Sequence, residues 1–361
     1  RQMCIRDRPA ICRLQVTERR DEGMNNNSGN DKTMTIHDVA RELGVSASTV
    51  SRAISGKGRI GAATRDRILD YIEEHGFYPN AAAQSLAQSK TNNIAIILPE
   101  VNTLVDMPFF HTCMYGVEEV AQANDYDIIV VTTNGNDTKP LERLIQNRKV
   151  DGMILTRTYE NDKYVKFLKQ KQIPFVAVGK FPDDDVVQVD HDNVGACKEL
   201  VTVLFAKGIQ NIAYLGSNMD QMVNRCRYQG YEEAYRKGKR KLNQDLVYTD
   251  LSSKAMVEKA VEELKKSGVE CILCQDDYIC DEAVRKLSHM GVRIPDQMKV
   301  ASCHYSRILE NYPVTVTSLK FNITELGRRS CQVLLDMIHG KTVPDKTLLD
   351  YEIILKESTK G

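Results

Sequence analysis

Net charge and long apolar runs are both absent from this sequence, and each absence excludes a class of protein. The 361 residues carry 49 basic and 49 acidic side chains, so the formal net charge is zero. The chain as a whole therefore does not attract nucleic acid or a membrane surface, and any contact with nucleic acid must come from a local patch. No apolar run approaches the roughly 20 residues that a membrane-spanning helix needs. The length allows two or three domains with sizeable cores.

Motifs of the common enzyme classes are missing as well. The chain contains no P-loop and no Gly-x-Ser-x-Gly. Its seven histidines do not cluster with cysteine or carboxylate at the spacing of metal ligands. We therefore expect no enzyme activity, no catalytic residue, no cofactor and no metal site.

Ten cysteines occur without a secretion signal, which is typical of a protein in the reducing cytoplasm. Cys271, Cys274 and Cys280 form the one cluster that resembles a metal site. The first two lie in "VECILC", which reads as a buried strand, and residues three apart on a strand point to opposite faces. Buried structural thiols are the favoured interpretation, and metal binding or redox use is the alternative.

The first 33 residues differ in character from the rest. They start with Arg1, lack the continuous apolar core of a signal peptide, and end in the polar, turn-rich "MNNNSGNDKT". We interpret residues 1–33 as a disordered or non-native leader, with Met34 or Met24 as the true start. A basic arm that touches DNA is the alternative.

Residues 34–78 show the pattern of three short helices. Thr35 and Asp38 are spaced as a capping box for the first helix. Gly44 suits the left-handed residue that ends it, and Ser46 can cap the second helix. Helix, short turn with glycine, and helix is the helix-turn-helix pattern. The expected inner faces of the three helices carry Val39, Ala40 and Leu43, then Val50 and Ile54, then Ile68, Leu69 and Ile72.

The second helix, in "SASTVSRAISG", has much small polar surface and little to bury. Short side chains at Ala47 and Ser48 would let its N-terminus approach base edges in a DNA major groove. Arg52, one turn further along, could reach guanine O6 and N7 as a bidentate donor. Thr49 and Ser51 could hydrogen-bond phosphates. An ordinary capped helix on a solvent-exposed surface is the alternative.

Two segments, "TIHDVARELGVSASTVSRAISG" and "ATRDRILDYIEEHGFYPNAAAQSLA", resemble the headpiece of the LacI/GalR family of bacterial transcription regulators over its whole length. The resemblance implies that Ala47, Ser48 and Arg52 read bases. We add Thr35, beside the phosphate-bonding hydroxyl residues of the second helix, to the expected DNA contacts.

The segment that follows, "YPNAAAQSLAQSKTNN", resembles the hinge helix of the same family. Pro79 breaks the third helix and Asn80 can cap a new one, but the run is too short to be stable alone. The resemblance implies that Leu86 wedges apart the central base step in the minor groove. It also implies that Ala83 and Gln84 are neighbouring groove contacts, and we add Asn80. A floppy interdomain linker is the alternative, and it applies when no DNA is bound.

From Ile94 onward, short apolar runs alternate with amphipathic stretches, which predicts parallel sheets in doubly wound α/β layers. The expected helices include 109–124, 138–148 and 161–171. There are too many strands for one sheet, so we expect two similar lobes, which resemble the periplasmic sugar-binding fold of the family. The expected strands are "IAIILP", "YDIIVVTT", "VDGMILT", "IPFVAVG", "VVQVD", "NIAYLG", "LVYTD", "VECILC" and "MKVASC".

The predicted protein is thus an all-α helix-turn-helix headpiece (34–78) and a hinge helix and linker (79–90), followed by a two-lobed α/β effector-binding and dimerisation domain (91–361). Lobe 1 is expected at about 91–189 and 319–342, and lobe 2 at about 190–318 and 343–361. The chain would cross between the lobes near Val189, Ser318 and Val343. A ligand is expected in the cleft, at the carboxyl ends of the strands.

Two segments near the expected cleft match family motifs. "MPFF" puts Phe109 and Phe110 at the cleft mouth, where an aromatic face could stack on a sugar ring, and core packing is the alternative. In "VDHDNVGA", Asp192 and Asn193 start the helix that enters the second lobe. Asp192 could also accept a hydrogen bond from a ligand hydroxyl.

Two further matches carry charge. In "NRCRYQGYEEAY", Arg227 matches the arginine that grips the effector in the family; a surface salt bridge is the alternative, and Arg225 is a weaker candidate. In "ILCQDDYICDEAVRKL", Asp277 matches a ligand-contacting aspartate, and Asp276 stands where the family usually has Asn. In "VASCHYSRI", His304 replaces a usual carboxylate. This favours an anionic ligand such as a sugar phosphate, unless His304 simply packs.

These features predict a cytoplasmic, sequence-specific DNA-binding regulator, a repressor of carbohydrate-utilisation genes. A homodimer would bind a pseudo-palindromic operator with half-sites about one helical turn apart. A sugar or sugar phosphate in the cleft would change DNA affinity to the extent that it prefers one state of the lobes. A protein corepressor (a phosphorylated carrier protein), a pure sugar-binding module and a nucleotide-dependent enzyme are the alternatives.

Overall fold

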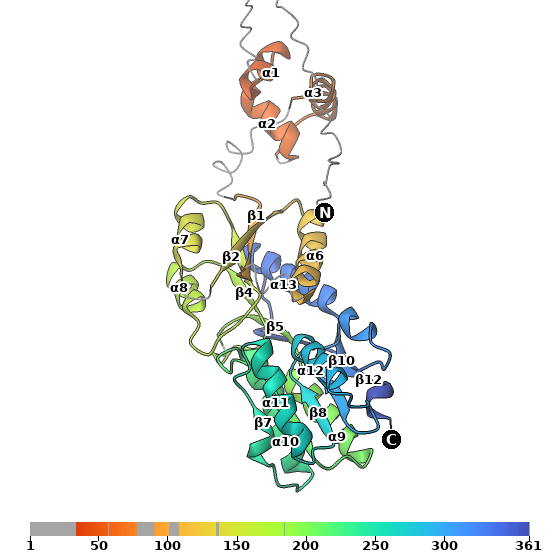
Figure 1. Cartoon of the computed structure of the whole chain (residues 1–361). Coiled ribbons are helices and arrows are strands. Elements are labelled where there is room, and N and C mark those ends of the chain that lie inside the picture. The colour runs from red at the N-terminus through yellow and green to blue at the C-terminus, as the bar shows by residue number, and fades with distance from the viewer. Residues whose placement is uncertain are drawn as a thin grey trace, which may run out of the picture. The chain divides into compact units, whose positions relative to one another are not determined.

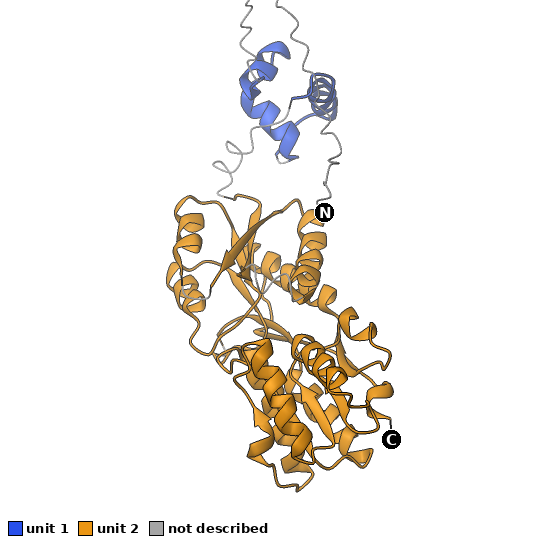
Figure 2. Cartoon of the chain, in the orientation of Figure 1, with its two compact units in different colours: residues 1–84 blue, residues 85–361 orange. Residues whose placement is uncertain are grey.

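The protein consists of two compact units, residues 1–84 and 85–361 (Figure 2). The computed structural model describes residues 34–56, 58–77, 90–100, 108–134, 137–183 and 185–360. The division between the units falls inside the segment expected to be the hinge. The leader 1–33 and the hinge residues Asn80, Ala83, Gln84 and Leu86 lie outside the described residues.

The described part of unit 1 contains three helices, α1 (Ile36–Glu42), α2 (Ala47–Ser55) and α3 (Ala62–Glu74). Both bonds of the predicted capping box between Thr35 and Asp38 are present. Gly44 adopts the left-handed conformation (φ +62°) after α1, and Ser46 caps α2. The predicted helix-turn-helix is therefore confirmed.

A small core holds these helices together, and its buried residues are Val39, Ala40, Val50, Ala53, Ile68 and Phe77. The expected inward position of Leu69 is wrong, because its side chain is 38% exposed. Ile68 and Ile72 are one turn apart and share the inner face of α3, whereas Leu69 is rotated by about 100° from Ile68. On α2, Ala53 rather than Ile54 is fully buried.

Lobe 1 of unit 2 (Figure 1) is built on a six-stranded parallel sheet, whose strand order is β11-β5-β4-β3-β1-β2. Its strands are β1 (Asn93–Pro99), β2 (Asp127–Thr133), β3 (Gly152–Leu155), β4 (Phe175–Val178), β5 (Gln188–His191) and β11 (Lys346–Leu349). Its helices are α6 (Pro108–Ala123), α7 (Lys139–Gln146), α8 (Lys163–Lys171) and α13 (Ile323–Ile338).

Lobe 2 is built on a second six-stranded sheet, β12-β10-β9-β8-β6-β7, in which only β12 runs antiparallel to its neighbour. Its strands are β6 (Ile212–Leu215), β7 (Val247–Tyr248), β8 (Cys271–Cys274), β9 (Lys299–Ser302), β10 (Thr317–Phe321) and β12 (Tyr351–Ile354). Its helices are α9 (Asn193–Ala206), α10 (Met222–Lys237), α11 (Lys254–Lys266) and α12 (Asp277–His289), with short 3₁₀ turns at Gln244–Leu246, Arg307–Glu310 and Glu357–Thr359.

Burial of the central strands on both faces explains their nearly continuous apolar sequences. In β1, Ile94 and Ile96 belong to one hydrophobic cluster and Ile97 belongs to the cluster on the other side. In β8, Cys271 and Cys274 likewise lie in different clusters, as their spacing predicts. Each of these thiols is buried, and burial raises its pKa.

The chain passes between the two lobes three times. The first two crossings, after His191 and after Phe321, lie two or three residues beyond Val189 and Ser318. The expected crossing near Val343 is wrong, because β11 is still an edge strand of the lobe 1 sheet and the chain crosses at Asp350. The sequence gave no signal for this boundary, because β11 and β12 are half-buried edge strands without an apolar run. A single residue separates them.

Candidate functional site

The exposed face of α2 carries the side chains that the sequence assigns to DNA. Ser48, Ser51 and Arg52 are exposed, whereas Ala47 and Thr49 are half-buried. Ala47 packs partly on the unit 1 core. The N-terminal turn of α2 therefore offers a surface of short side chains with one long cation behind it.

Hydroxyl groups at the start of α2 form a small network. The Ser46 Oγ accepts a hydrogen bond from the Thr49 amide at 3.1 Å. The same oxygen lies 2.8 Å from Ser48 Oγ and 2.7 Å from Thr49 Oγ1. The network fixes the cap, and the positive end of the helix beside it favours an anion such as a phosphate.

Arg52 extends from α2 along the following turn. A Cβ atom at Gly58, where φ is +92°, would lie 3.3 Å from the Cδ of Arg52. Glycine at this position therefore leaves room for the arginine stem and also permits the backbone conformation. The guanidinium end of Arg52 can then reach away from the helix.

Thr35 lies at the start of α1, where it is exposed. Its hydroxyl donates to Asp38 Oδ2 at 2.6 Å, and the Asp38 amide donates back to Thr35 Oγ1 at 3.3 Å. The hydrogen bonds from the Thr35 side chain and backbone, with the nearby charge of Arg41, hold the pKa of Asp38 below its ordinary value.

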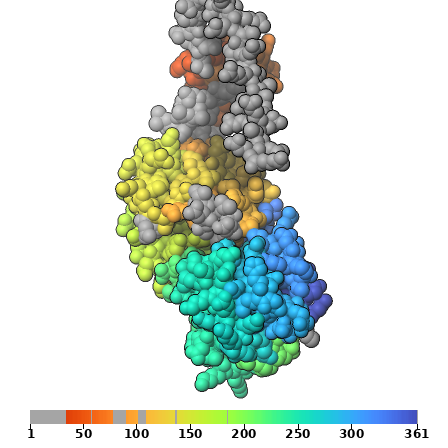
Figure 3. Space-filling model, in the orientation of Figure 1, coloured from red at the N-terminus to blue at the C-terminus, as the bar shows by residue number. Residues whose placement is uncertain are grey.

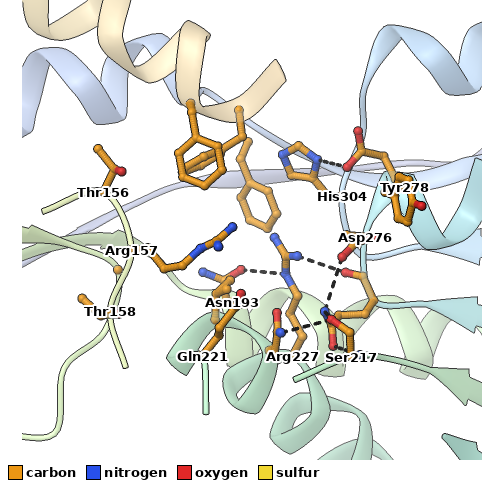
Figure 4. Close-up of a pocket in the computed structure, with 18 of the residues that line it drawn as sticks. Thr156, Arg157, Thr158, Asn193, Ser217, Gln221, Arg227, Asp276, Tyr278 and His304 are labelled. Atoms are coloured by element: carbon orange, nitrogen blue, oxygen red, sulfur yellow. Dashed lines mark hydrogen bonds and ion pairs between the residues drawn. The ribbon is translucent and has the colours of Figure 1, made fainter. Parts of the chain in front are cut away.

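In unit 2, a pocket of about 430 Å³ lies between the lobes, at the carboxyl ends of the strands (Figure 4). Phe109, Phe110, Arg227, Asp277 and His304, five of the six predicted effector residues, line it. Other lining side chains are Thr156, Arg157, Thr158, Asp190, His191, Asn193, Ser217, Asn218, Gln221, Asn224, Gln275, Asp276, Tyr278 and Phe321.

Arg227 projects from α10 into the floor of the pocket and is 8% exposed (Figure 4). Its Nε donates to Asn193 Oδ1 at 3.2 Å, and its Nη1 donates to the carbonyl oxygen of Gln275 at 3.0 Å. Both acceptors are neutral. The guanidinium is therefore held in place by hydrogen bonds rather than by an ion pair.

Asn193 connects this arginine to a buried acid. Its Nδ2 donates to Asp190 Oδ1 at 3.0 Å, so Asp190, Asn193 and Arg227 form a chain across the pocket floor. Burial raises the pKa of Asp190 to about 7, against the opposing effects of the His191 amide and the Arg227 charge. Burial, together with the charges of His304 and Arg227, lowers the pKa of His191 to about 4.

Asp277 and His304 form a buried pair at one side of the pocket, with His304 Nδ1 3.0 Å from Asp277 Oδ1. Burial by itself would raise the pKa of Asp277. The hydrogen bonds from His304 and Ser306 and the charge of His304 outweigh burial, so the pKa of Asp277 is below its ordinary value. The carboxylate therefore stays ionised and fixed in position.

An aromatic wall faces these polar groups from lobe 1. Phe109 and Phe110 meet edge to face with ring centroids 5.2 Å apart, and Phe109 approaches His304 at 6.3 Å. Phe110 is almost fully buried, and the guanidinium of Arg157 lies over its ring at 5.0 Å. The pocket thus combines an aromatic wall with converging hydrogen-bond donors and acceptors, which suits a polar ligand with an apolar face.

Two sequence profiles match the chain. Residues 35–80 match the bacterial regulatory proteins of the lacI family, and residues 91–357 match the periplasmic binding proteins and sugar-binding domain of the LacI family. The chain belongs to the LacI family of bacterial regulatory proteins.

Individual relatives of this LacI-family protein are transcription regulators. The regulator MalR of Streptococcus pneumoniae serotype 4 is 29% identical over 337 residues, which cover 90% of this chain and 99% of MalR. The solved transcriptional regulator CelR–cellobiose complex is 26% identical, with a TM-score of 0.69, and the match covers 90% of this chain and 99% of that one. The Lac repressor dimer, solved with operator and the anti-inducer ONPF, shares the fold at 20% identity, with a TM-score of 0.77 and coverage of 91% and 100%.

Membership of the LacI family and these relatives make the chain a DNA-binding transcription regulator with a sugar-binding type of effector domain. Members of the family are regulators rather than enzymes. None of the helices in the described part of the chain is long and apolar enough to cross a membrane.

Two candidate effector residues of the LacI-family pocket lie elsewhere than expected. Asp192 does not line the pocket; it is exposed, and its Oδ1 accepts a hydrogen bond from the Gly195 amide at 2.8 Å as the cap of α9. One step along the chain reverses the direction of the side chain, so Asn193 faces the pocket instead. Arg225 is bound to Glu160 by two hydrogen bonds, at 2.6 and 2.9 Å.

Arg157 is the main pocket residue that the sequence analysis missed. It follows β3, so the rule that ligands bind at the carboxyl ends of parallel strands could have found it. Asp190 lies near the end of β5 in lobe 1 and Gln275 directly follows β8 in lobe 2, so the same rule could have found both residues. Gln221 and Asn224 lie on the first turn of α10 or just before it, and no motif marks them.

Proposed function

We propose that this LacI-family regulator is a repressor of carbohydrate-utilisation genes that acts in the cytoplasm and has no enzyme activity. In this proposal, α2 of unit 1 enters the major groove. Ala47, Ser48 and Arg52 read base edges, and Thr35, Thr49 and Ser51 contact the DNA backbone. The exposed positions of Ser48, Ser51 and Arg52 support this assignment.

The proposed operator is pseudo-palindromic, and a homodimer binds it with one headpiece on each half-site. The segment that contains Leu86 would wedge the central base step, and Asn80, Ala83 and Gln84 would contact the minor groove beside it. The likeness of the fold to the Lac repressor dimer, solved with its operator, supports this arrangement.

The proposed effector is a sugar or a sugar phosphate bound by Phe109, Phe110, Arg227, Asp277 and His304. The main support for this effector site is that residues of both lobes line the pocket, so a bound ligand would touch both lobes. The solved CelR complex, whose ligand is cellobiose, supports a sugar in the corresponding domain. A ligand that favours the closed state of the lobes can change DNA affinity only if the closed and open states differ in their affinity for DNA.

Contacts between the two lobes support the proposal that the lobes close on a ligand. A segment of lobe 1 at 158–160 meets a segment of lobe 2 at 220–225, and we call this set of contacts the clasp. Lobe 1 and lobe 2 also adjoin directly in the space-filling view, as yellow and green to cyan surfaces (Figure 3). The clasp consists of the Tyr159–Gln221 bridge, the bonds from Met222 N to Thr158 O and from Glu160 N to Asp220 O, both 3.1 Å, and the Arg225–Glu160 ion pair.

The test begins with selection of operator sequences from random DNA by the full chain. Fluorescence anisotropy then measures the affinity for the selected operator with and without each of a panel of sugars and sugar phosphates. We expect a palindromic selected site and at least one compound that changes the affinity. Selection of no common sequence, or DNA affinity that no compound changes, would contradict the proposal.

A further inference from the structure

The last residues of α10 and the loop that follows carry a dense run of positive charge. Residues 236–241 read Arg-Lys-Gly-Lys-Arg-Lys, and we call them the basic turn. Because the formal net charge of the whole chain is zero, these five cations are a local feature. None of them lines the effector pocket, and none belongs to the helix-turn-helix. Short runs of this composition are typical of surfaces that bind polyanions.

The basic turn lies at the end of lobe 2 that is remote from the effector pocket. Near its start α10 carries Asn224 and Arg227, which line the pocket, and its 16 residues span about 24 Å. In Figure 1 the region of α9 and α10 at the bottom of the view is the part of unit 2 farthest from lobe 1. A partner bound to the basic turn therefore leaves the pocket unobstructed.

Hydrogen bonds and an aromatic ring fix the backbone of the basic turn. Three hydrogen bonds of 2.9–3.1 Å join the amides of residues 238–240 to carbonyl oxygens of residues 234–236. The guanidinium of Arg240 lies 4.3 Å from the centre of the Phe205 ring and hydrogen-bonds to Gln210. An ordered backbone reduces the entropy that is lost when the turn binds a partner.

A further lysine lies beside the basic turn, at the end of α9. The rings of Phe205 on α9 and Tyr235 on α10 meet edge to face, with centroids 5.0 Å apart. The ends of the two helices are therefore neighbours, and Lys207 directly follows α9. We call the basic turn together with Lys207 the basic end of lobe 2.

Four lysines of the basic end are exposed and form no ion pair with another residue in the described part of the chain: Lys207, Lys237, Lys239 and Lys241. Two acids nearby are already engaged. Glu233 pairs with Lys198 at 3.0 Å and with Arg236 at 3.7 Å. Glu270 accepts from the amides of residues 210 and 211, at 2.6 and 2.7 Å. The positive charge of the four lysines is thus available to an external partner.

The helix ends account for only part of this charge. The C-terminus of a helix carries about half a negative charge, so the ends of α9 and α10 together balance about one lysine. Backbone amides already donate to carbonyl oxygens in the last turns of both helices, so lysine side chains are not needed there as caps. Most of the positive charge of the basic end therefore has another use.

The basic end offers charge without an apolar centre. None of the exposed large apolar side chains in the described chain lies between residues 198 and 242. Protein partners usually bind through buried aromatic or aliphatic anchors. Duplex DNA is instead bound without sequence preference by lysine and arginine side chains that contact its phosphates. The composition of the basic end favours the DNA backbone over an acidic protein.

We propose that the basic end binds the phosphate backbone of double-stranded DNA without sequence preference. This site is additional to α2 and does not depend on the effector pocket. The described part of unit 2 starts at residue 90, just before the amino end of β1 in lobe 1. Unit 1 is therefore joined to the opposite end of unit 2 from the basic end. When α2 holds the operator, the basic end holds a second segment of DNA.

Fluorescence anisotropy of the full chain tests the proposal. Unlabelled selected operator, added in stoichiometric amount well above its Kd, first occupies the headpieces. A short fluorescein-labelled duplex without the operator sequence is then the probe. We expect the probe to bind this complex with an affinity that falls steeply as the salt concentration rises.

A triple variant shows whether the basic end is responsible. Combined Lys237→Gln, Lys239→Gln and Lys241→Gln should weaken binding of the probe about tenfold or more at low salt. The slope of log affinity against log salt should fall by up to about three, because each lost phosphate contact removes about one. Operator affinity and melting temperature should equal those of the wild type, which shows that the variant is folded.

The matched control removes the same charge from lobe 1. Combined Lys149→Gln, Lys163→Gln and Lys166→Gln changes three exposed lysines that form no ion pair with another described residue. This control should bind the probe as the wild type does. Equal losses in the two triple variants would mean that net charge alone, and not the basic end, attracts the probe.

Lysine acetylation locates the contact without any operator. The full chain is treated with an acetylating reagent in the presence and absence of the random duplex, and mass spectrometry measures the modification of each lysine. We expect the duplex to protect the four lysines of the basic end and not the three control lysines. Because no operator is used, failure to select an operator does not affect this result.

Three results would overturn the proposal: a probe that does not bind the operator complex, a triple variant that binds it as the wild type does, or lysines of the basic end that the duplex does not protect. Poly-L-glutamate tests the alternative partner. If it displaces the probe at a lower concentration of charge than unlabelled duplex does, the basic end binds an acidic protein rather than DNA.

Discussion

At the scale of single residues, two hydrogen bonds connect the side chains of Asp190, Asn193 and Arg227 on the pocket floor. These three side chains set the charge of the floor. The amide of Asn193 separates the acid from the guanidinium and hydrogen-bonds to both. Arg227 therefore keeps N–H donors that can bind a ligand. The buried carboxyl of Asp190 remains close enough for its pKa to be affected by the charge of Arg227. His191, with a pKa of about 4, stays neutral beside them at neutral pH.

Asp190→Asn should remove a pH dependence of stability. The pKa of Asp190 is about 3.8 in the unfolded state and about 7 in the folded state. Between these pH values the folded state therefore holds one more proton than the unfolded state. The stability of the wild type consequently falls as the pH rises through this range. The stability difference between the variant and the wild type should therefore grow from pH 4 to 7, on the order of 3 kcal/mol, and then stay constant. Urea denaturation at a series of pH values measures it.

Asp296→Asn, a substitution of an exposed acid, is the control for this experiment. His191 contributes in the opposite direction, because its lowered pKa makes the unfolded state hold the extra proton between about pH 4 and 6.5. Comparison of each variant with the wild type removes this contribution. A stability difference that does not change with pH would contradict the raised pKa of Asp190.

Arg52→Ala should relax operator specificity at one base pair. Loss of a bidentate contact to guanine costs about 1–3 kcal/mol on the preferred operator and almost nothing on an operator with that base pair changed. Anisotropy titrations on the two DNA sequences, at one salt concentration, compare the losses. Equal losses on both would mean that Arg52 contacts only phosphate.

At the scale of elements, close helix contacts hold the lobes in shape. In lobe 1, α6 and α13 approach so closely that a Cβ at Gly116 would lie 2.0 Å from the carbonyl oxygen of Thr324. A Cβ at Gly327 would lie 2.1 Å from the carbonyl oxygen of Cys113. The helix α13 follows the second crossing, and α6 carries Phe109 of the pocket in its first turn. The close contact between the two helices therefore links the crossing to the ligand site.

Gly116→Ala should therefore destabilise unit 2. The added methyl group meets backbone atoms that cannot move alone, which costs about 1–3 kcal/mol and outweighs the gain in helix propensity of about 0.5–1 kcal/mol. Thermal unfolding by circular dichroism measures the change. Glu118→Ala, at an exposed position of the same helix, should stay within about 0.5 kcal/mol of the wild type. An unchanged melting temperature for Gly116→Ala would contradict the close approach.

At the scale of the whole unit, we propose that the clasp and the pocket act on the same equilibrium between open and closed lobes. The clasp joins the segments at 158–160 and 220–225, and in this proposal a ligand that touches both lobes favours the state in which these segments meet. The Arg225–Glu160 pair is about 40% and 46% exposed, so its contribution is modest.

Glu160→Gln should shift the lobes toward the open state and weaken effector binding. Loss of an exposed ion pair is worth up to about 1 kcal/mol, so we expect at most about a fivefold higher Kd. Titration calorimetry measures the affinity, and small-angle X-ray scattering without ligand should show a larger radius of gyration. The control is Asp296→Asn, which breaks an ion pair within lobe 2. Unchanged affinity and radius would mean that the clasp does not contribute to closure.

Local patterns predicted much of this architecture. Caps and a left-handed glycine identify α1 and α2, and apolar runs identify the central strands of both sheets. The strands β10, β11 and β12 were not predicted from the sequence. The strand β10 carries polar Thr317 and Ser318, and the other two are half-buried edge strands. The prediction for Leu69 was wrong because an apolar residue next to the inner face of a helix does not by itself show whether it points inward.

Pocket residues that belong to a family motif were predictable, and those that depend on tertiary geometry were not. Phe109, Arg227, Asp277 and His304 stand in recognisable segments. Arg157 reaches the same pocket only because β3 ends beside β1 and β4 in the folded sheet. Asp192 and Asn193 show the limit of motif reasoning, since neighbouring residues at a helix start point in different directions and only one faces the pocket.

Occupancy of the interlobe pocket should control DNA affinity. The most direct measurement is the Kd for the selected operator at increasing concentrations of the bound effector, for the wild type and for Arg227→Ala. We expect the effector to change the wild-type Kd by about fivefold or more and to leave the Kd of the variant unchanged. Without effector, both proteins should bind the operator equally well. An effector that fills the pocket but leaves the wild-type Kd unchanged would mean that pocket occupancy does not control DNA affinity.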